Sequence, residues 1–252
     1  MKYLFLLAHP DDEAVAAGGT VRRLADQGDE VVVVLATKGE AGPTSLGVNR
    51  IDEFKKSCEI LGVSKTEILK YKDGEINNKQ VWGELELQLI EQVETYRPDV
   101  VVTFDHSGWY FHLDHVGVSI AALRAVQHAK HKVQAMAFML FHPPGIKIKW
   151  PYVYQKKLPI THVVDIKKVL KHKVEAIKAH QSQSMSFLPY LESGKMNREY
   201  FQLVLATKKG KEWFNKHKIF KKYEGVYFSW DDEQSRGKLV SVVKTPINKS
   251  RN

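Results

Sequence analysis

The chain has one cysteine, Cys58, and this scarcity excludes several kinds of site. A single thiol can neither form a disulfide within the chain nor supply a multi-cysteine metal centre. Ile51, Phe54, Cys58 and Leu61 recur at helical spacing. We therefore expect Cys58 to lie on the buried face of a helix, where a thiol is unreactive.

Long apolar runs are also absent, and none approaches the roughly 20 residues that a membrane-spanning helix requires. Residues 3–8 form a short apolar run after Lys2, but Asp11-Asp12-Glu13 stands where a signal-peptide cleavage site would be. We expect a buried strand at residues 3–8, no membrane span and a cytoplasmic protein.

Two nucleotide-binding patterns are missing. No G-x-G-x-x-G follows the first predicted strand, and the chain has no G-x-x-x-x-G-K-[ST] phosphate loop. The net charge of +9 suggests a nucleic-acid partner as an alternative. However, residues 208–252 carry +7 of that charge, so the other 207 residues are nearly neutral. We expect no nucleic-acid partner.

What is present is a regular alternation of apolar runs with helical patterns. Predicted strands cover residues 3–8, 30–36, 67–71, 99–104, 135–141 and 162–165, and predicted helices cover 12–27, 50–61, 80–96, 115–130 and 167–180. The continuous runs Val31–Val34 and Val100–Val102 are typical of parallel strands covered on both faces. This predicts an α/β, Rossmann-like three-layer fold, with a mainly parallel sheet and helices on both faces.

The chain length suits one α/β domain with a modest extension. We expect a single domain over residues 1–230, followed by a basic, flexible tail over residues 231–252. The tail is polar, with Ser, Gly, Pro and Asn scattered through it. Its short apolar stretch, residues 239–243, could dock elsewhere on the protein.

The block His9-Pro10-Asp11-Asp12-Glu13 directly follows the first predicted strand. In an open α/β sheet ligands bind at the carboxyl ends of strands, so one imidazole and three carboxylates stand where a site usually lies. Asp11 or Asp12 could instead cap the next helix. Capping explains one Asp but not the whole block, and Pro10 restricts the turn.

A second block, Phe111-His112-Leu113-Asp114-His115, follows the fourth predicted strand and opens a helix. His112 and His115 are three residues apart and can share one side of a helical turn. Taken alone, two solvent-facing histidines at a helix start explain this block equally well. Two such blocks at equivalent edges of one parallel sheet are far less expected by chance.

The two blocks together suit a hydrolytic zinc, which usually has three N or O ligands and one open position. His9, Asp12 and His115 supply two imidazoles and one carboxylate, which leave the bound metal electrophilic. Asp11 then remains as a base for a water molecule. His112 remains as a donor, and Asp114 stands where it could orient that imidazole.

These residues carry a family resemblance. The sequence resembles the LmbE-like (PIG-L) N-acetylglucosaminyl deacetylases, first in Ala8–Glu13 with Gly18-Gly19-Thr20, and then in His112-x-Asp114-His115. Weaker matches are residues 37–42, Arg50 with Glu53, residues 61–63, 73–74 and 173–183, and Tyr223–Gly225 with Phe228. The main matches span residues 1 to about 185. Phe111 and Leu113 depart from the family, which commonly has a small residue and Pro there.

The resemblance implies one zinc per chain, bound by His9, Asp12 and His115, although another divalent metal could serve in the cell. It implies that Asp11 is the general base. It also implies that a protonated His112, oriented by Asp114, stabilises the oxyanion. The residues expected to contact substrate are Arg50 and Asp73. Trp109 and Tyr110 either form a sugar-facing wall or pack in the interior.

The expected function is therefore a zinc-dependent hydrolase that removes the N-acetyl group from an N-acetylglucosamine-type sugar or conjugate and releases acetate. Its partner would be a small N-acetylated sugar, and a homo-oligomer is compatible with the sequence. Two alternatives remain: a metal-dependent hydrolase of another amide, and a non-catalytic binding protein on the same fold.

Overall fold

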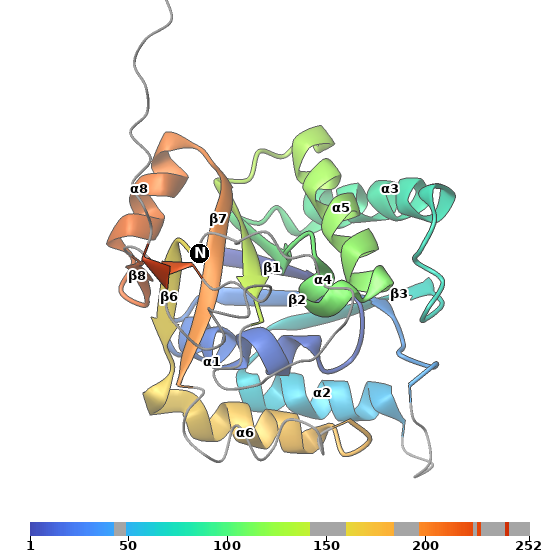
Figure 1. The fold of residues 1–252 in the computed structure, drawn as a ribbon, viewed down its shortest axis with the longest axis horizontal. Coiled ribbons are helices and arrows are strands. Elements are labelled where there is room, and N and C mark those ends of the chain that lie inside the picture. Colours follow the sequence, from blue (N-terminus) through green and yellow to red (C-terminus); the bar gives the residue numbers. More distant parts are fainter. Residues whose placement is uncertain (43–48, 142–159, 184–196, 224–225, 228–239, 242–252) are drawn as a thin grey trace, which may run out of the picture.

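The computed structural model describes residues 1–42, 49–141, 160–183, 197–223, 226–227 and 240–241 (Figure 1). In chain order, the elements are β1 (Lys2–Leu7), α1 (Asp12–Asp26), β2 (Glu30–Thr37), α2 (Arg50–Leu61), β3 (Lys65–Tyr71), α3 (Lys79–Tyr96), β4 (Val100–Phe104), α4 (Gly108–Phe111), α5 (Leu113–His128), β5 (Ala135–Leu140), β6 (His162–Asp165), the 3-10 helix η1 (Lys167–Val169), α6 (Leu170–Ala179), β7 (Arg198–Ala206), α8 (Lys208–Lys216), β8 (Phe220–Lys222), β9 (Val226–Tyr227) and β10 (Val240–Ser241).

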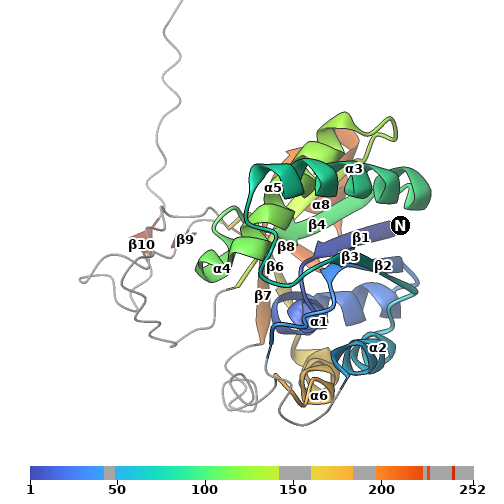
Figure 2. The ribbon, with the colours of Figure 1, turned by 90° about the vertical axis from the view of Figure 1, so that its right-hand side faces the viewer.

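The main sheet has the strand order β3-β2-β1-β4-β5-β7-β6-β8. The strands from β3 to β5 pair in parallel, whereas β7 is antiparallel to β5 and β6, and β8 is antiparallel to β6. Helices α1, α2 and α6 cover one face, and α3 and α5 cover the other (Figures 1 and 2). The predicted three-layer α/β fold is confirmed, with a sheet that becomes mixed at one end.

The central strands form because both of their faces are buried. Val31–Val34 and Val100–Val102 are at most 1% exposed, as their continuous apolar pattern predicted. Tyr3 lies in register between Val31 on one side and Val100 on the other. Each fully buried side chain of this size stabilises the fold by about 1.5–3 kcal/mol, so these strands anchor the domain.

The prediction missed β7, which lies between β5 and β6, as well as the edge strand β8 and the helix α8. In sequence, Glu199 interrupts the apolar pattern of β7. In the structure Glu199 is buried, accepts a 2.6 Å bond from Lys173 Nζ, and accepts the amide N–H groups of Gly19 and Thr20. A carboxylate so satisfied can be buried within a strand, and sequence alone does not reveal its partners.

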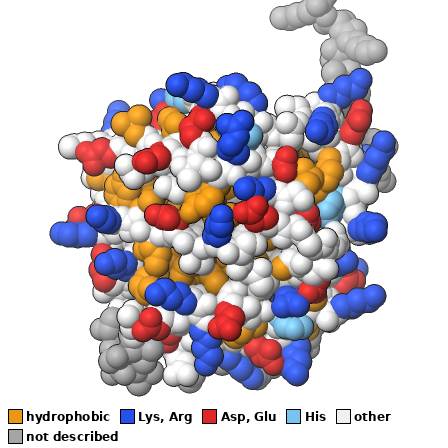
Figure 3. Space-filling model, turned by 180° about the vertical axis from the view of Figure 1, so that it is seen from behind, with side chains coloured by type: hydrophobic (Ala, Val, Ile, Leu, Met, Phe, Trp, Pro, Cys, Tyr) orange, Lys and Arg blue, Asp and Glu red, His pale blue; other side chains and the backbone are white. Residues whose placement is uncertain are grey.

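None of the described helices combines the length and apolarity needed to cross a membrane. On the face opposite that of Figure 1, Lys and Arg lie among Asp and Glu and form no field of one sign (Figure 3). Of the predicted tail, the structure describes only β10, which pairs antiparallel with β9. The rest of residues 231–252 lies outside the described part, and the domain boundary at residue 230 stays a prediction.

Candidate active site

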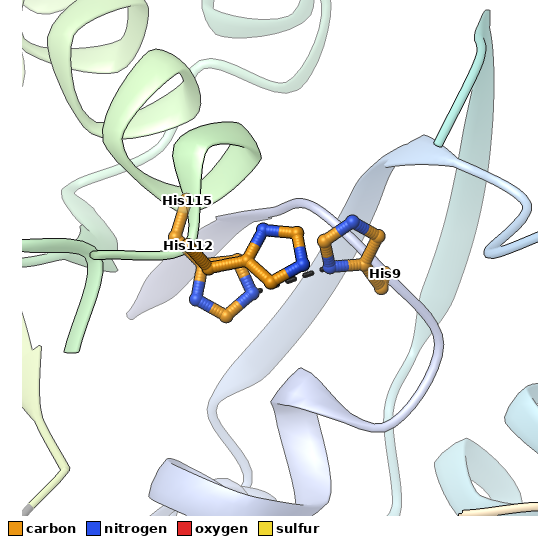
Figure 4. A group of neighbouring side chains, drawn as sticks. All are labelled: His9, His112 and His115. Atoms are coloured by element: carbon orange, nitrogen blue, oxygen red, sulfur yellow. Dashed lines mark hydrogen bonds between the residues drawn. The ribbon is translucent and has the colours of Figure 1, made fainter. Parts of the chain in front are cut away.

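The two sequence blocks meet where the strand order reverses. His9 follows β1, whereas His112 and His115 begin α5, shortly after β4. Because β1 and β4 are parallel neighbours, their carboxyl ends lie side by side, at the point where open α/β sheets bind ligands. Figure 4 shows the three imidazoles gathered, His9 from the loop after β1 and the other two from α5.

The three predicted metal ligands converge. His115 Nε2 lies 3.2 Å from His9 Nδ1 and 3.2 Å from Asp12 Oδ1. His9 Nδ1 lies 3.8 Å from Asp12 Oδ2. All three side chains are buried. Two imidazole nitrogens and a carboxylate therefore point at one small volume, an arrangement of lone pairs that a divalent cation satisfies.

His112 lies beside this donor set. Its ring centroid is 4.6 Å from that of His9 and 4.6 Å from that of His115. One nitrogen from each of the three imidazoles falls within 4.8 Å of the others. The geometry therefore admits His112 either as a metal ligand or as a neighbouring hydrogen-bond donor. The metal content of a His112→Ala variant distinguishes these two roles.

Neither Asp11 nor Asp12 caps helix α1. The Asp12 carboxylate turns back from the helix and accepts the backbone N–H groups of Ala8 at 3.1 Å and His9 at 2.7 Å. Asp11 occupies the N-cap position and makes no side-chain capping bond. The capping alternative is therefore wrong, and both carboxylates are left for the site.

The structure gives Asp114 a different partner from the predicted one. Its carboxylate accepts the backbone N–H groups of Gly74 at 2.7 Å and Ile76 at 3.0 Å, and lies 3.1 Å from His9 Nε2. Among the described residues, no hydrogen bond or ion pair joins Asp114 to His112. The amides of the loop after β3 draw this carboxylate toward His9.

Asp73 shares this task, because its Oδ1 lies 3.0 Å from the same His9 Nε2. With Nε2 bound by Asp73 and Asp114, the His9 ring presents Nδ1 to His115 and Asp12. A carboxylate on the far nitrogen is the usual support of a metal-binding histidine, since it sets the tautomer and the ring orientation.

The surroundings shift the pKa values of two histidines in opposite directions. Burial disfavours a charged His9, but the bonds to Asp114 and Asp73 and the charge of Asp12 outweigh it and raise the pKa to about 10. Burial, and then the positive charges of His115 and His9, lower the pKa of His112 to about 4. Burial and neighbouring positive charge thus disfavour the charged form of His112, and its predicted role as a protonated donor stays a prediction.

Asp11 differs from its neighbours in its backbone conformation and in its pKa. Its φ is 114°, and its side chain is 20% exposed, with Oδ2 3.8 Å from Arg50 Nη2. Burial, and then the charge of Asp12, raise the pKa of Asp11 to about 7, against the opposing effects of His180 and Arg50. A carboxyl group with a pKa near neutrality can both take and return a proton.

Arg50 and Asp73 hold loops around the site. The buried Arg50 guanidinium donates to the carbonyl oxygens of Gly39 at 2.5 Å and Pro10 at 2.7 Å. Its Nη1 lies 3.9 Å from Asp73 Oδ2, an oxygen that also accepts the N–H of Ala41 at 3.1 Å. The expected contact of these two residues with substrate stays a prediction.

Aromatic packing fixes His115 from behind. The ring of Phe104 stacks on the ring of His115, with the ring centroids 4.0 Å apart and an interplanar angle of 8°. Trp109 is 5% exposed and donates its Nε1–H to Met139 O at 3.1 Å, so it packs in the interior. Phe111 and Leu113, the departures from the family pattern, are exposed on either side of His112.

The sequence prediction assigned no role to a buried cluster behind Asp11. The Glu13 carboxylate accepts bonds from His180 Nε2 at 2.7 Å, Ser57 Oγ at 2.6 Å and Asp11 N at 3.1 Å. The sequence contained two signals of this cluster: Glu13 ends the first block, and His180 lies in residues 173–183, a segment that resembles the family. Cys58, next to Ser57, is buried as predicted, and burial raises the pKa of its thiol.

Comparisons with known proteins find a similarity to deacetylases. The family model of PIG-L, GlcNAc-PI de-N-acetylase, matches residues 4–126, which contain both blocks. Diacetylchitobiose deacetylase of Thermococcus kodakarensis is 29% identical over 208 residues, which cover 72% of this chain and 70% of that protein. The 1D-myo-inositol 2-acetamido-2-deoxy-alpha-D-glucopyranoside deacetylase of Mycolicibacterium smegmatis is 29% identical over 231 residues. The match covers 72% of this chain and 80% of that protein.

A solved structure extends the likeness to three dimensions. N,N'-diacetylchitobiose deacetylase from Pyrococcus horikoshii, complexed with its inhibitor MPG, matches with a TM-score of 0.61 and 25% identity. The match covers 81% of this chain and 83% of that one.

Proposed function

We propose that this chain removes the acetyl group from an N-acetylglucosamine-type sugar or conjugate, because a family model of PIG-L, GlcNAc-PI de-N-acetylase, matches residues 4–126 and similar proteins are named deacetylases. The observation that supports this most directly is the convergence of two imidazoles and a carboxylate beside a second, half-buried carboxylate. A divalent metal and a base so placed can together hydrolyse an amide.

We propose His9, Asp12 and His115 as the ligands of one zinc ion. A divalent metal held there would supply a Lewis acid that lowers the pKa of a water molecule and polarises an acyl oxygen. Two imidazoles and one carboxylate form a common zinc ligand set, although iron and cobalt also accept it. Asp73 and Asp114 support this set through His9 Nε2.

In the proposed reaction Asp11 takes a proton from water as the water oxygen attacks the acetyl carbon. His112 donates an N–H to the oxygen on which negative charge develops. The C–N bond then breaks, Asp11 returns its proton to the departing nitrogen, and acetate and a free amine result. A pKa near neutrality suits Asp11 to both transfers.

The proposed substrate is a small N-acetylated sugar, the class for which the relatives are named. A cytoplasmic location belongs to the same proposal. The test is to incubate the metal-loaded protein with N-acetylglucosamine, diacetylchitobiose and an N-acetylglucosaminyl inositol, and to follow acetate and free amine by mass spectrometry. Release from at least one, absent with Asp11→Asn, supports the proposal. A folded, metal-loaded protein that releases acetate from none contradicts it.

His112→Ala tests whether this residue is a donor or a ligand. We expect kcat to fall by roughly 10²–10³-fold, the usual effect of removing one oxyanion donor, while metal content stays normal. Steady-state kinetics and metal analysis of the same preparation check this. Loss of metal would show that His112 is a ligand and that the assigned set is incomplete.

Truncation after Trp230 tests the proposed domain boundary. Both metal blocks and the family match lie before it, so we expect a folded protein whose kcat/KM stays within a few-fold of the full chain. The comparison should be made at low and at moderate salt, because the removed segment is basic. A truncated protein that is folded and metal-loaded but inactive would place the tail in the site.

A further inference from the structure

The backbone of Asp11 has a conformation that an aspartate seldom adopts. Its φ is 114° and its ψ −25°, in the region that favours glycine. Such a conformation costs energy and persists only when the surroundings impose it. The Asp11 side chain makes no capping hydrogen bond to helix α1 that would offset this cost. Some other group must hold this residue.

The peptide groups on both sides of Asp11 are held. The Asp11 N–H donates to Glu13 Oε2 at 3.1 Å. The carbonyl oxygen of Asp11 accepts the N–H groups of Ala14 and Val15 at 3.0 Å each, inside α1. Arg50 binds the preceding carbonyl, that of Pro10, at 2.7 Å. Of these contacts, the Glu13 bond is the one that holds the N–H of the strained residue itself.

Glu13 is in turn held from two other elements. Its Oε1 accepts from His180 Nε2 at 2.7 Å, at the end of α6, and from Ser57 Oγ at 2.6 Å, on α2. Glu13, Ser57 and His180 are at most 1% exposed. With two donors on one oxygen, the carboxylate cannot rotate freely, so its second oxygen is presented to Asp11 N.

We propose that Glu13, held by His180 and Ser57, is a positioning residue that imposes the backbone conformation of Asp11 and so aims its carboxylate at the reacting water. This rests on the proposed function, through the role of Asp11 as base. A misplacement of about 1 Å in a reacting group can cost roughly 10²-fold in rate. Glu13 therefore acts on turnover through Asp11, without touching substrate.

The chain offers a matched control in Glu199. Like Glu13, it is a buried carboxylate that accepts backbone N–H groups and binds a buried basic side chain: it accepts from Gly19 N and Thr20 N, in α1, and pairs with Lys173. Its bonds go to no residue of the proposed site. Loss of Glu199 should therefore lower stability as loss of Glu13 does, while it leaves Asp11 in place.

The test compares Glu13→Met and Glu199→Met with the wild-type enzyme. Met keeps the side-chain length and cannot replace the carboxylate acceptor. For Glu13→Met we expect kcat to fall about 10²-fold, with KM within about twofold and metal content unchanged. Glu13→Gln should recover part of kcat, because its amide oxygen can still accept the Asp11 N–H. Glu199→Met should keep kcat. Equal loss in both Met variants, or no loss in Glu13→Met, overturns the proposal.

A double-mutant cycle separates this inference from the proposed function. In an Asp11→Asn background, Glu13→Met should lower kcat by less than about threefold, because its effect passes through Asp11. A full further loss overturns the inference alone. Near wild-type activity of Asp11→Asn instead overturns the base assignment. A crystal structure of Glu13→Met gives a readout that does not depend on activity. We expect the backbone φ of Asp11 to become negative in this variant, and an unchanged φ overturns the inference.

Discussion

Asp11→Asn should retain metal and bind substrate normally, while kcat falls by roughly 10²–10⁴-fold. The amide preserves the shape of the side chain and removes its ability to take a proton. Asn also tolerates a positive φ better than most residues, so the backbone at 114° should persist. The variant thus isolates the chemistry of one carboxylate. Steady-state kinetics with metal analysis measures both parts of the expectation.

A suitable control is Asp26→Asn, at the other end of the same helix, where the carboxylate pairs with Arg22 and is 42% exposed. It should leave kcat and KM unchanged. If Asp11→Asn kept a near wild-type kcat, another group would have to serve as the base. If it lost metal, Asp11 would be part of the ligand set.

Removal of a metal ligand should have an effect at least as large. We expect His9→Ala, Asp12→Ala and His115→Ala each to lose most of the bound metal and nearly all activity. The three donor groups lie within 3.8 Å of one another, so none has a substitute in the same place with the same geometry. Elemental analysis after dialysis, with activity measured before and after metal addition, tests this expectation.

His162→Ala is the matched control for these variants, because His162 is as buried as His9 but lies on β6, away from the site. It should keep its metal even if it loses stability. Full metal content in all three ligand variants would refute the assigned set. Retention in one variant alone would point to His112 as the replacement ligand, since its ring is 4.6 Å from those of His9 and His115.

The position of the site could be predicted because each block is contiguous and follows a strand with a strong apolar pattern. Val31–Val34 and Val100–Val102 are buried on both faces, and a parallel sheet brings the residues after β1 and β4 to one edge. His9, Asp12 and His115 therefore converge whatever the details of the loops. Local pattern and strand direction were sufficient for that much.

Tertiary structure alone decided which groups these side chains bind. Asp114 was expected to pair with His112, two residues away, but the amides of Gly74 and Ile76 compete for its carboxylate and turn it to His9. Glu199 looks like a surface residue in sequence, yet Lys173 and the N–H groups of α1 hold it inside. A buried carboxylate goes where donors satisfy it, and those donors come from segments far along the chain. The sequence determined where the functional groups meet, and the folded chain determined how each one is held.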